Sequence, residues 1–124
     1  MLKTNSKKAR ENIKNYILEN VDFSDCTLEK MPETDAEKLT ALFTIANSEA
    51  RYSKKESDFE VLKNWICGIP SILSVCDFIY YAGAKKVLAE LLEETPEEAD
   101  RYSDDKSFNM LVYLISKEII KAAY

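Results

Sequence analysis

The sequence predicts an all-α protein: a single-domain bundle of five to seven helices around a central apolar helix at about residues 70–81. Apolar residues recur at three- and four-residue spacing through most of the chain, as on one side of an amphipathic helix. Glycine and proline, which the turns of sheet proteins need, number only 2 and 3 in 124 residues. No alternation of apolar and polar residues continues for the length of a strand.

The first two predicted helices each begin at a polar residue that suits an N-cap. The first covers about residues 6–20 and is capped by Asn5 or Ser6. Its apolar side consists of Ala9, Ile13, Tyr16 and Ile17. The second follows a capping box formed by Thr34 and Glu37 and continues to about residue 52. Residues 1–5 are expected to be flexible.

The middle of the chain is its most apolar part. Ser57 and Glu60 form another capping box, and the helix after it has an apolar side made of Phe59, Leu62, Trp65 and Ile66. Gly68 suits the end of that helix, and Pro70 suits the first turn of the next. The helix at 70–81 is apolar on nearly all sides, which is typical of a helix covered by its neighbours. A further helix is predicted over residues 84–92.

Two more helices complete the predicted fold. Thr95, Pro96 and Glu98 begin a short acidic helix in the preferred order of cap, proline and acid. Ser103 or Asp104 caps a final helix that continues to the C-terminus. Its apolar side consists of Phe108, Leu111, Val112, Ile115 and Ile119. Residues 1–124 therefore form one domain.

Composition limits the chemistry that this chain can perform. It contains no histidine, the commonest general base and metal ligand, and its net charge is −5. The 3 cysteines (Cys26, Cys67 and Cys76) form no metal-binding motif and no disulfide framework, which favours a reducing, cytoplasmic location. No catalytic residue, metal ligand or cofactor is predicted, and the chain is not expected to be an enzyme.

The segment 65–84 contains a single charged residue, Asp77, and is long enough to cross a bilayer. Gly68, Pro70 and the central carboxylate favour a buried core helix instead, and no membrane association is predicted. Asp77 itself is either a buried acid or a residue on the solvent side of its helix.

Three groups of residues are candidates for contacting a partner. The acidic run includes Glu93, Glu94, Glu97 and Glu98, and an exposed aromatic at Tyr81 would make an interface anchor. The alternative is a set of phosphate contacts on the N-terminal helix, formed by Lys7, Lys8, Arg10 and Lys14. Each group is also consistent with an ordinary solvated helix surface or, for Tyr81, with core packing.

Five stretches of the chain together resemble a small uncharacterised family encoded on prophages and conjugative elements of gut anaerobes. They are NSKKARENIKNYI, DFSD, NWICGIPSIL, LLEETPEE and LVYLISKEIIK, and the most specific positions are Trp65, Gly68, Pro70 and Ser71. In that family a cysteine follows the tryptophan, whereas here Ile66 takes its place and Cys67 comes one residue later. The family has no assigned activity, so the resemblance implies only a mobile-element setting.

These observations predict a non-enzymatic interaction protein that binds a protein partner of unknown identity, as an adaptor or inhibitor of a larger machine. The alternative is a nucleic-acid-associated accessory protein that uses the basic N-terminal helix.

Overall fold

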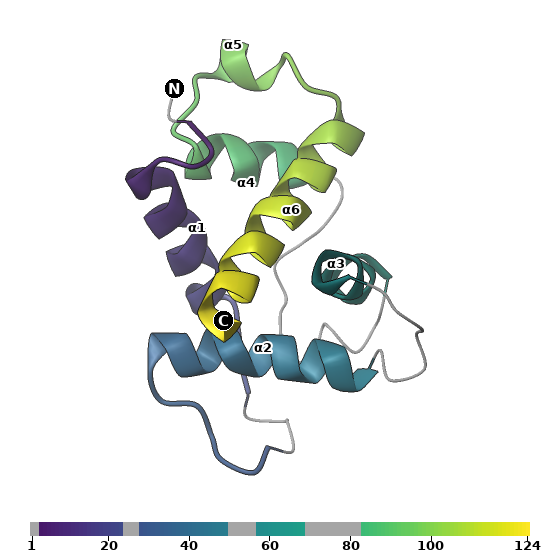
Figure 1. Cartoon of the computed structure of the whole chain (residues 1–124). Coiled ribbons are helices and arrows are strands. Elements are labelled where there is room, and N and C mark those ends of the chain that lie inside the picture. Colours follow the sequence, from purple (N-terminus) through teal and green to yellow (C-terminus); the bar gives the residue numbers. More distant parts are fainter. Residues whose placement is uncertain (1–2, 24–27, 50–56, 69–82) are drawn as a thin grey trace.

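The computed structural model describes residues 3–23, 28–49, 57–68 and 83–124. They form six helices, and helix accounts for 73% of these residues, which include no strand. The helices are α1 (Lys7–Glu19), α2 (Asp35–Glu49), α3 (Asp58–Gly68), α4 (Ala84–Leu91), α5 (Pro96–Ala99) and α6 (Asp104–Ala123). The predicted all-α bundle is confirmed (Figure 1).

The long helix α6 is central to the described part of the bundle. It packs on α1, α2, α3 and α4, and Figure 1 shows it crossing diagonally from α4 toward α2. Of its predicted apolar side, Leu111, Val112, Ile115 and Ile119 are buried and Phe108 is half-buried. Leu114 is buried as well, because neighbouring helices cover α6 from several directions. The helix predicted at residues 70–81 lies outside the described residues.

The predicted helix starts are confirmed by hydrogen bonds from backbone N–H groups to capping hydroxyls. Each capping side chain accepts from the residue three positions later. The pairs are Ser6 and Ala9 (3.1 Å), Thr34 and Glu37 (3.1 Å), Ser57 and Glu60 (3.2 Å), Thr95 and Glu98 (3.2 Å), and Ser103 and Lys106 (3.1 Å). Ser6 and Ser103 are therefore the caps of α1 and α6, where the sequence left a second residue open in each case.

The C-terminus of α4 turns sharply without a glycine. Glu93 adopts φ 53°, and its N–H donates to the Glu90 carbonyl at 3.2 Å while the Glu94 N–H donates to the Ala89 carbonyl at 2.9 Å. These two bonds form a Schellman motif, in which the left-handed residue is usually glycine. The Asn12 side chain, reaching across from α1, donates to the Leu91 carbonyl at 2.9 Å and to the Glu93 carboxylate at 3.3 Å. A residue of α1 thus helps to hold the end of α4.

We expect the substitution Glu93→Gly to raise the free energy of unfolding by about 0.5–1 kcal/mol. Glycine removes the cost of a left-handed backbone, and part of that gain is offset by the greater freedom of the unfolded chain and by loss of the exposed hydrogen bond from Asn12 to the Glu93 carboxylate. Chemical denaturation followed by circular dichroism measures the change. The matched control is Glu90→Gly, which replaces an exposed glutamate within the same helix and should lower stability by ~1 kcal/mol. A loss of stability in both variants would contradict strain at Glu93.

Candidate functional site

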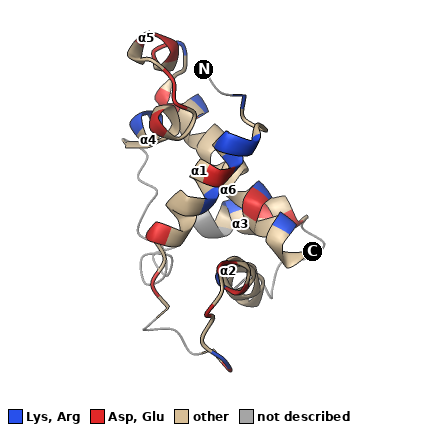
Figure 2. Cartoon of the chain, turned by 90° about the vertical axis from the view of Figure 1, so that its left-hand side faces the viewer, with Lys and Arg blue, Asp and Glu red and all other residues tan. Residues whose placement is uncertain are grey.

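The predicted acidic run lies on a projection from the bundle, here called the acidic arm and defined as residues 93–105. Its helix, α5, contributes no buried residue and packs mainly on α4. Glu93 and Glu97 are exposed, whereas Glu94 and Glu98 are half-buried. Figures 1 and 2 show α5 at one extremity of the molecule, with acidic residues concentrated there. The arm therefore presents carboxylates without contributing α5 side chains to the core.

Local bonds hold the arm in shape. The Thr95 hydroxyl accepts from the Glu98 N–H, and the Glu98 carboxylate accepts from the Thr95 N–H at 3.1 Å, which completes a reciprocal capping box. Pro96 occupies the first turn, where its missing N–H costs no hydrogen bond. Lys85 on α4 forms an ion pair of 3.5 Å with Asp100. The arm is thus fixed at its start, within its helix and against α4.

Two glutamates of the arm have pKa values shifted in opposite directions. The hydrogen bond from the Thr95 N–H lowers the pKa of Glu98 from its ordinary value of 4.5 because it stabilises the ionised carboxylate. Burial, followed by repulsion from Glu98, raises the pKa of Glu94. Glu98 is therefore the more firmly ionised of the two, and it is tied to the backbone of the arm.

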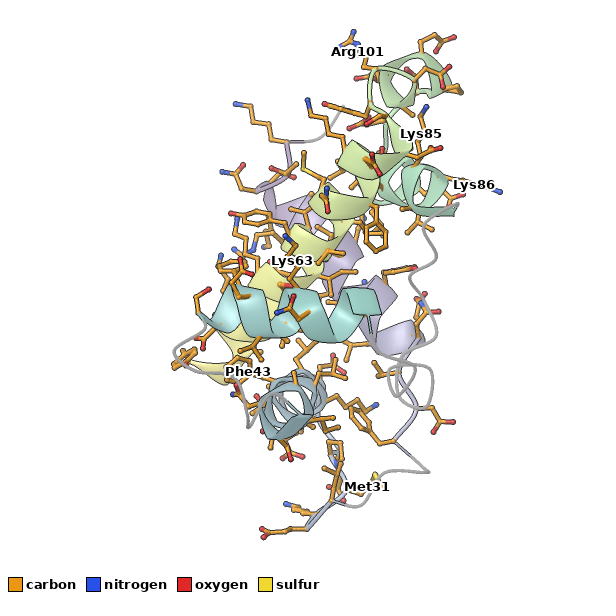
Figure 3. The ribbon with its side chains drawn as sticks, turned by 90° about the vertical axis from the view of Figure 1, so that its right-hand side faces the viewer. Met31, Phe43, Lys63, Lys85, Lys86 and Arg101 are labelled. Carbon is orange, nitrogen blue, oxygen red and sulfur yellow. The ribbon has the colours of Figure 1, made fainter. Side chains whose placement is uncertain are left out.

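A groove of about 510 Å³ lies between α4, the arm and the start of α6. Lys85 and Lys86 line it together with five carboxylates, those of Glu90, Glu93, Glu94, Asp100 and Asp104. Figure 3 shows the two lysines on α4 at the same end of the molecule as Arg101, far from Met31. Because carboxylates predominate, the groove suits cationic side chains better than phosphates.

The predicted phosphate contacts on α1 do not form one free basic surface. Lys7, Lys8 and Lys14 are exposed, but the Arg10 Nε lies 3.4 Å from the carboxylate of Glu118 on α6. The Glu118 side chain is 3% exposed, so Arg10 compensates a buried negative charge and stabilises the folded state. Lys8 also lines a groove with Glu19, Glu90 and Glu93. These carboxylates would repel a phosphate backbone.

The exposed aromatic residues found in the structure were not anticipated. Tyr81 and Asp77 lie outside the described residues. Phe59 and Tyr113, which are 38% and 50% exposed, stack with ring centroids 5.3 Å apart and an angle of 9° between the planes. The prediction that Phe59 lies on the inner side of its helix was wrong, because Val61 and Leu62 occupy the buried side of α3. No local pattern indicates that Tyr113 is exposed, since only tertiary packing pairs it with Phe59 of α3.

Within the part of the chain that the structure describes, no group of three carboxylates or cysteines is placed to hold a metal ion. None of the described helices is both long enough and apolar enough to span a membrane.

We expect Arg10→Met to lower the free energy of unfolding by about 1–3 kcal/mol, because it leaves the buried Glu118 carboxylate without its cation. Denaturant unfolding measures this loss. Lys14→Met is the control: it removes an exposed cation from the same helix and should change stability by less than about 0.5 kcal/mol. Adding Glu118→Gln to Arg10→Met should recover part of the loss. Equal costs for Arg10→Met and Lys14→Met would show that the pair has no structural role.

An NMR titration of the glutamate carboxyls should find that Glu98 protonates below pH 4.5 and that Glu94 protonates above it. Since the pKa of Glu98 is lowered by folding, its contribution to the arm is present above its unfolded pKa and lost as the pH falls through its folded value. Thr95→Ala should raise the pKa of Glu98, because the loss of the hydroxyl cap lets the end of α5 fray.

The second capping box supplies the control for this titration. The pKa of Glu37 is lowered by hydrogen bonds from the N–H groups of Glu33 and Thr34. Thr34→Ala should therefore raise the pKa of Glu37 and leave that of Glu98 unchanged. If Thr95→Ala does not move the Glu98 titration, the capping box does not determine the charge state of the arm.

Comparison with known proteins adds no assignment to these surfaces. A scan against protein-family models, a search of curated proteins and a search of solved structures each found no match to this chain. What the surfaces can bind is therefore inferred from their residues and geometry.

Proposed function

We propose that this chain is a non-enzymatic interaction protein that binds a basic surface of a protein partner through the acidic arm. In the mobile-element setting implied by the sequence resemblance, it acts as an adaptor or inhibitor of a larger protein machine. Its location is cytoplasmic.

One observation supports this proposal above the others. None of the residues of α5 is buried, yet defined hydrogen bonds hold both ends of the arm in place. The Schellman motif at Glu93, the capping box at Thr95 and the cap at Ser103 define the two ends of the arm. A prearranged set of carboxylates loses little conformational entropy on binding, which favours affinity. Charge complementarity would direct the arm toward lysine- and arginine-rich surfaces and speed association.

The proposed absence of catalysis rests on composition and on the chemistry of the groove beside the arm. The chain has no histidine, so a histidine-activated nucleophile cannot be formed within it. Among the described residues that line the groove, the carboxylates are accompanied by lysines but by no cysteine or serine. Such a set suits reversible ion pairing.

The second candidate function is an association with nucleic acid, favoured by the three exposed lysines of α1. Lys7, Lys8 and Lys14 would contact phosphates, and binding would weaken steeply with salt. The structure changes how this candidate must be tested. Arg10 pairs with Glu118, so its neutralisation would confuse loss of binding with loss of stability. A clean variant carries Lys7→Gln, Lys8→Gln and Lys14→Gln and keeps Arg10.

The test is a tagged pull-down from cells that carry the mobile element, with and without nuclease, followed by affinity measurements with the recovered partner. The variant Glu93→Gln/Glu97→Gln should weaken binding roughly three- to tenfold, with a shallower salt dependence, because it removes two exposed charges from the arm. Both changes leave the Glu98 capping box intact. The control Glu29→Gln/Glu33→Gln changes the net charge equally at two exposed positions before α2 and should bind as the unaltered protein does.

Equal binding by both variants would exclude the arm as the contact. If nuclease treatment abolishes recovery of the partner, and the triple lysine variant abolishes it too, the contact is α1 and not the arm. The ligand is then nucleic acid and not a protein.

A further inference from the structure

A second cavity, which shares only Glu94 of its described lining with the groove beside the arm, lies where the N-terminal turn meets α4 and α6. Its volume of about 550 Å³ is within the range of small-molecule sites in proteins. Residues 3–5 form one wall, held in a turn by a 3.0 Å hydrogen bond from the Ser6 N–H to the Lys3 carbonyl. The cap at Ser6 then fixes this turn to the start of α1. The wall is thus a defined part of the fold.

The cavity has more cationic than anionic residues in its lining. Lys3 and Lys117 come from opposite ends of the chain and face a single carboxylate, that of Glu94. In the groove beside the arm and in the groove lined by Lys8, by contrast, carboxylates outnumber lysines. Among the described residues, neither Lys3 nor Lys117 forms an ion pair. Glu94 can therefore balance only one of these two positive charges within the described lining.

The rest of the lining combines an apolar floor with hydroxyl groups. Leu88 and Leu92 are each 3% exposed, and Met110 is packed against the core beside them. Tyr102 and Tyr113 add aromatic rings and phenolic O–H donors to the walls. Polar side chains predominate in the lining, and Met110 with the two tyrosine rings supplies an apolar part against which an organic molecule held by its charged end can pack.

We propose that this cavity binds a small organic anion, a carboxylate or phosphate monoester carried on an aromatic or aliphatic body. Lys3 and Lys117 hold the anionic end, and the body packs against Met110 and the rings of Tyr102 and Tyr113. The site does not depend on the acidic arm binding a partner, since the purified protein alone contains every residue that it needs.

The experiment titrates the full-length protein with phenyl phosphate and with benzoate, followed by amide chemical shifts and by calorimetry. Saturable binding should shift the amides around residues 3–5, the end of α4 and the middle of α6. Inorganic phosphate tests the charge alone and benzyl alcohol tests the apolar body alone, and each should bind at least about tenfold more weakly. If phenyl phosphate binds more tightly than benzoate, the preferred ligand class is a phosphate ester. If benzoate binds more tightly, it is a carboxylate.

Variants distinguish this cavity from nonspecific attraction. Lys117→Gln should weaken binding about tenfold, whereas Glu94→Gln should tighten it because it removes the one carboxylate found among the described lining residues. Lys121→Gln is the matched control, since Lys121 is exposed one turn further along α6 and does not line the cavity. Unfolding curves of all three variants establish that each is folded.

The proposal fails if neither organic anion binds saturably, or if benzyl alcohol binds as tightly as they do. It also fails if Lys117→Gln and Lys121→Gln bind alike. None of these results bears on the arm, whose test requires a protein partner.

Discussion

The burial of α6 is the constraint on which the rest of the described structure depends. Its middle turns are covered by α1, α2, α3 and α4, and Ile115 and Ile119 have no exposed surface. Burying an aliphatic side chain of this size stabilises a fold by about 1.5–3 kcal/mol. Because α6 supplies the common surface for four helices, its contacts determine which side of each of them faces inward.

The contact between α6 and α1 includes a charge inside the protein. Glu118 is almost completely buried, and Arg10 supplies the compensating cation from the edge of α1. A buried carboxylate without such a partner costs several kcal/mol, so α1 can occupy few other orientations. In this orientation Asn12 reaches the end of α4, where it binds the Leu91 carbonyl. The position of α1 is therefore coupled to that of α4, which carries the acidic arm.

The two candidate binding regions adjoin at the arm. Glu94 and Tyr102 belong to the arm and also line the cavity with Lys3 and Lys117, whereas Glu97 faces solvent. Cationic and anionic surfaces thus lie close together at the α5 end of the molecule, although the net charge of the chain is −5. Overall charge describes neither surface, because the Debye length at physiological salt is only about 8 Å and each ligand responds to nearby groups.

The sequence by itself determined the helical class and the starts of the described helices, including α4, which begins at the predicted Ala84 without a capping side chain. These features are local: Ser6, Thr95 and Ser103 bond to N–H groups three residues away, so their effect is visible in a short stretch of sequence. The acidic run was equally visible, and its exposure follows from the absence of apolar residues in α5.

Only the tertiary structure decided how distant residues combine. It paired Arg10 with Glu118, which removed an arginine from the predicted phosphate contacts, and it placed Phe59 against Tyr113 at the surface. It also brought Lys3 and Lys117 into one cavity. Helical periodicity indicates which side of a helix is apolar. Which other helix packs against that side depends on the path of the whole chain. That path is set by the packing of complete helices on α6, which no local pattern encodes.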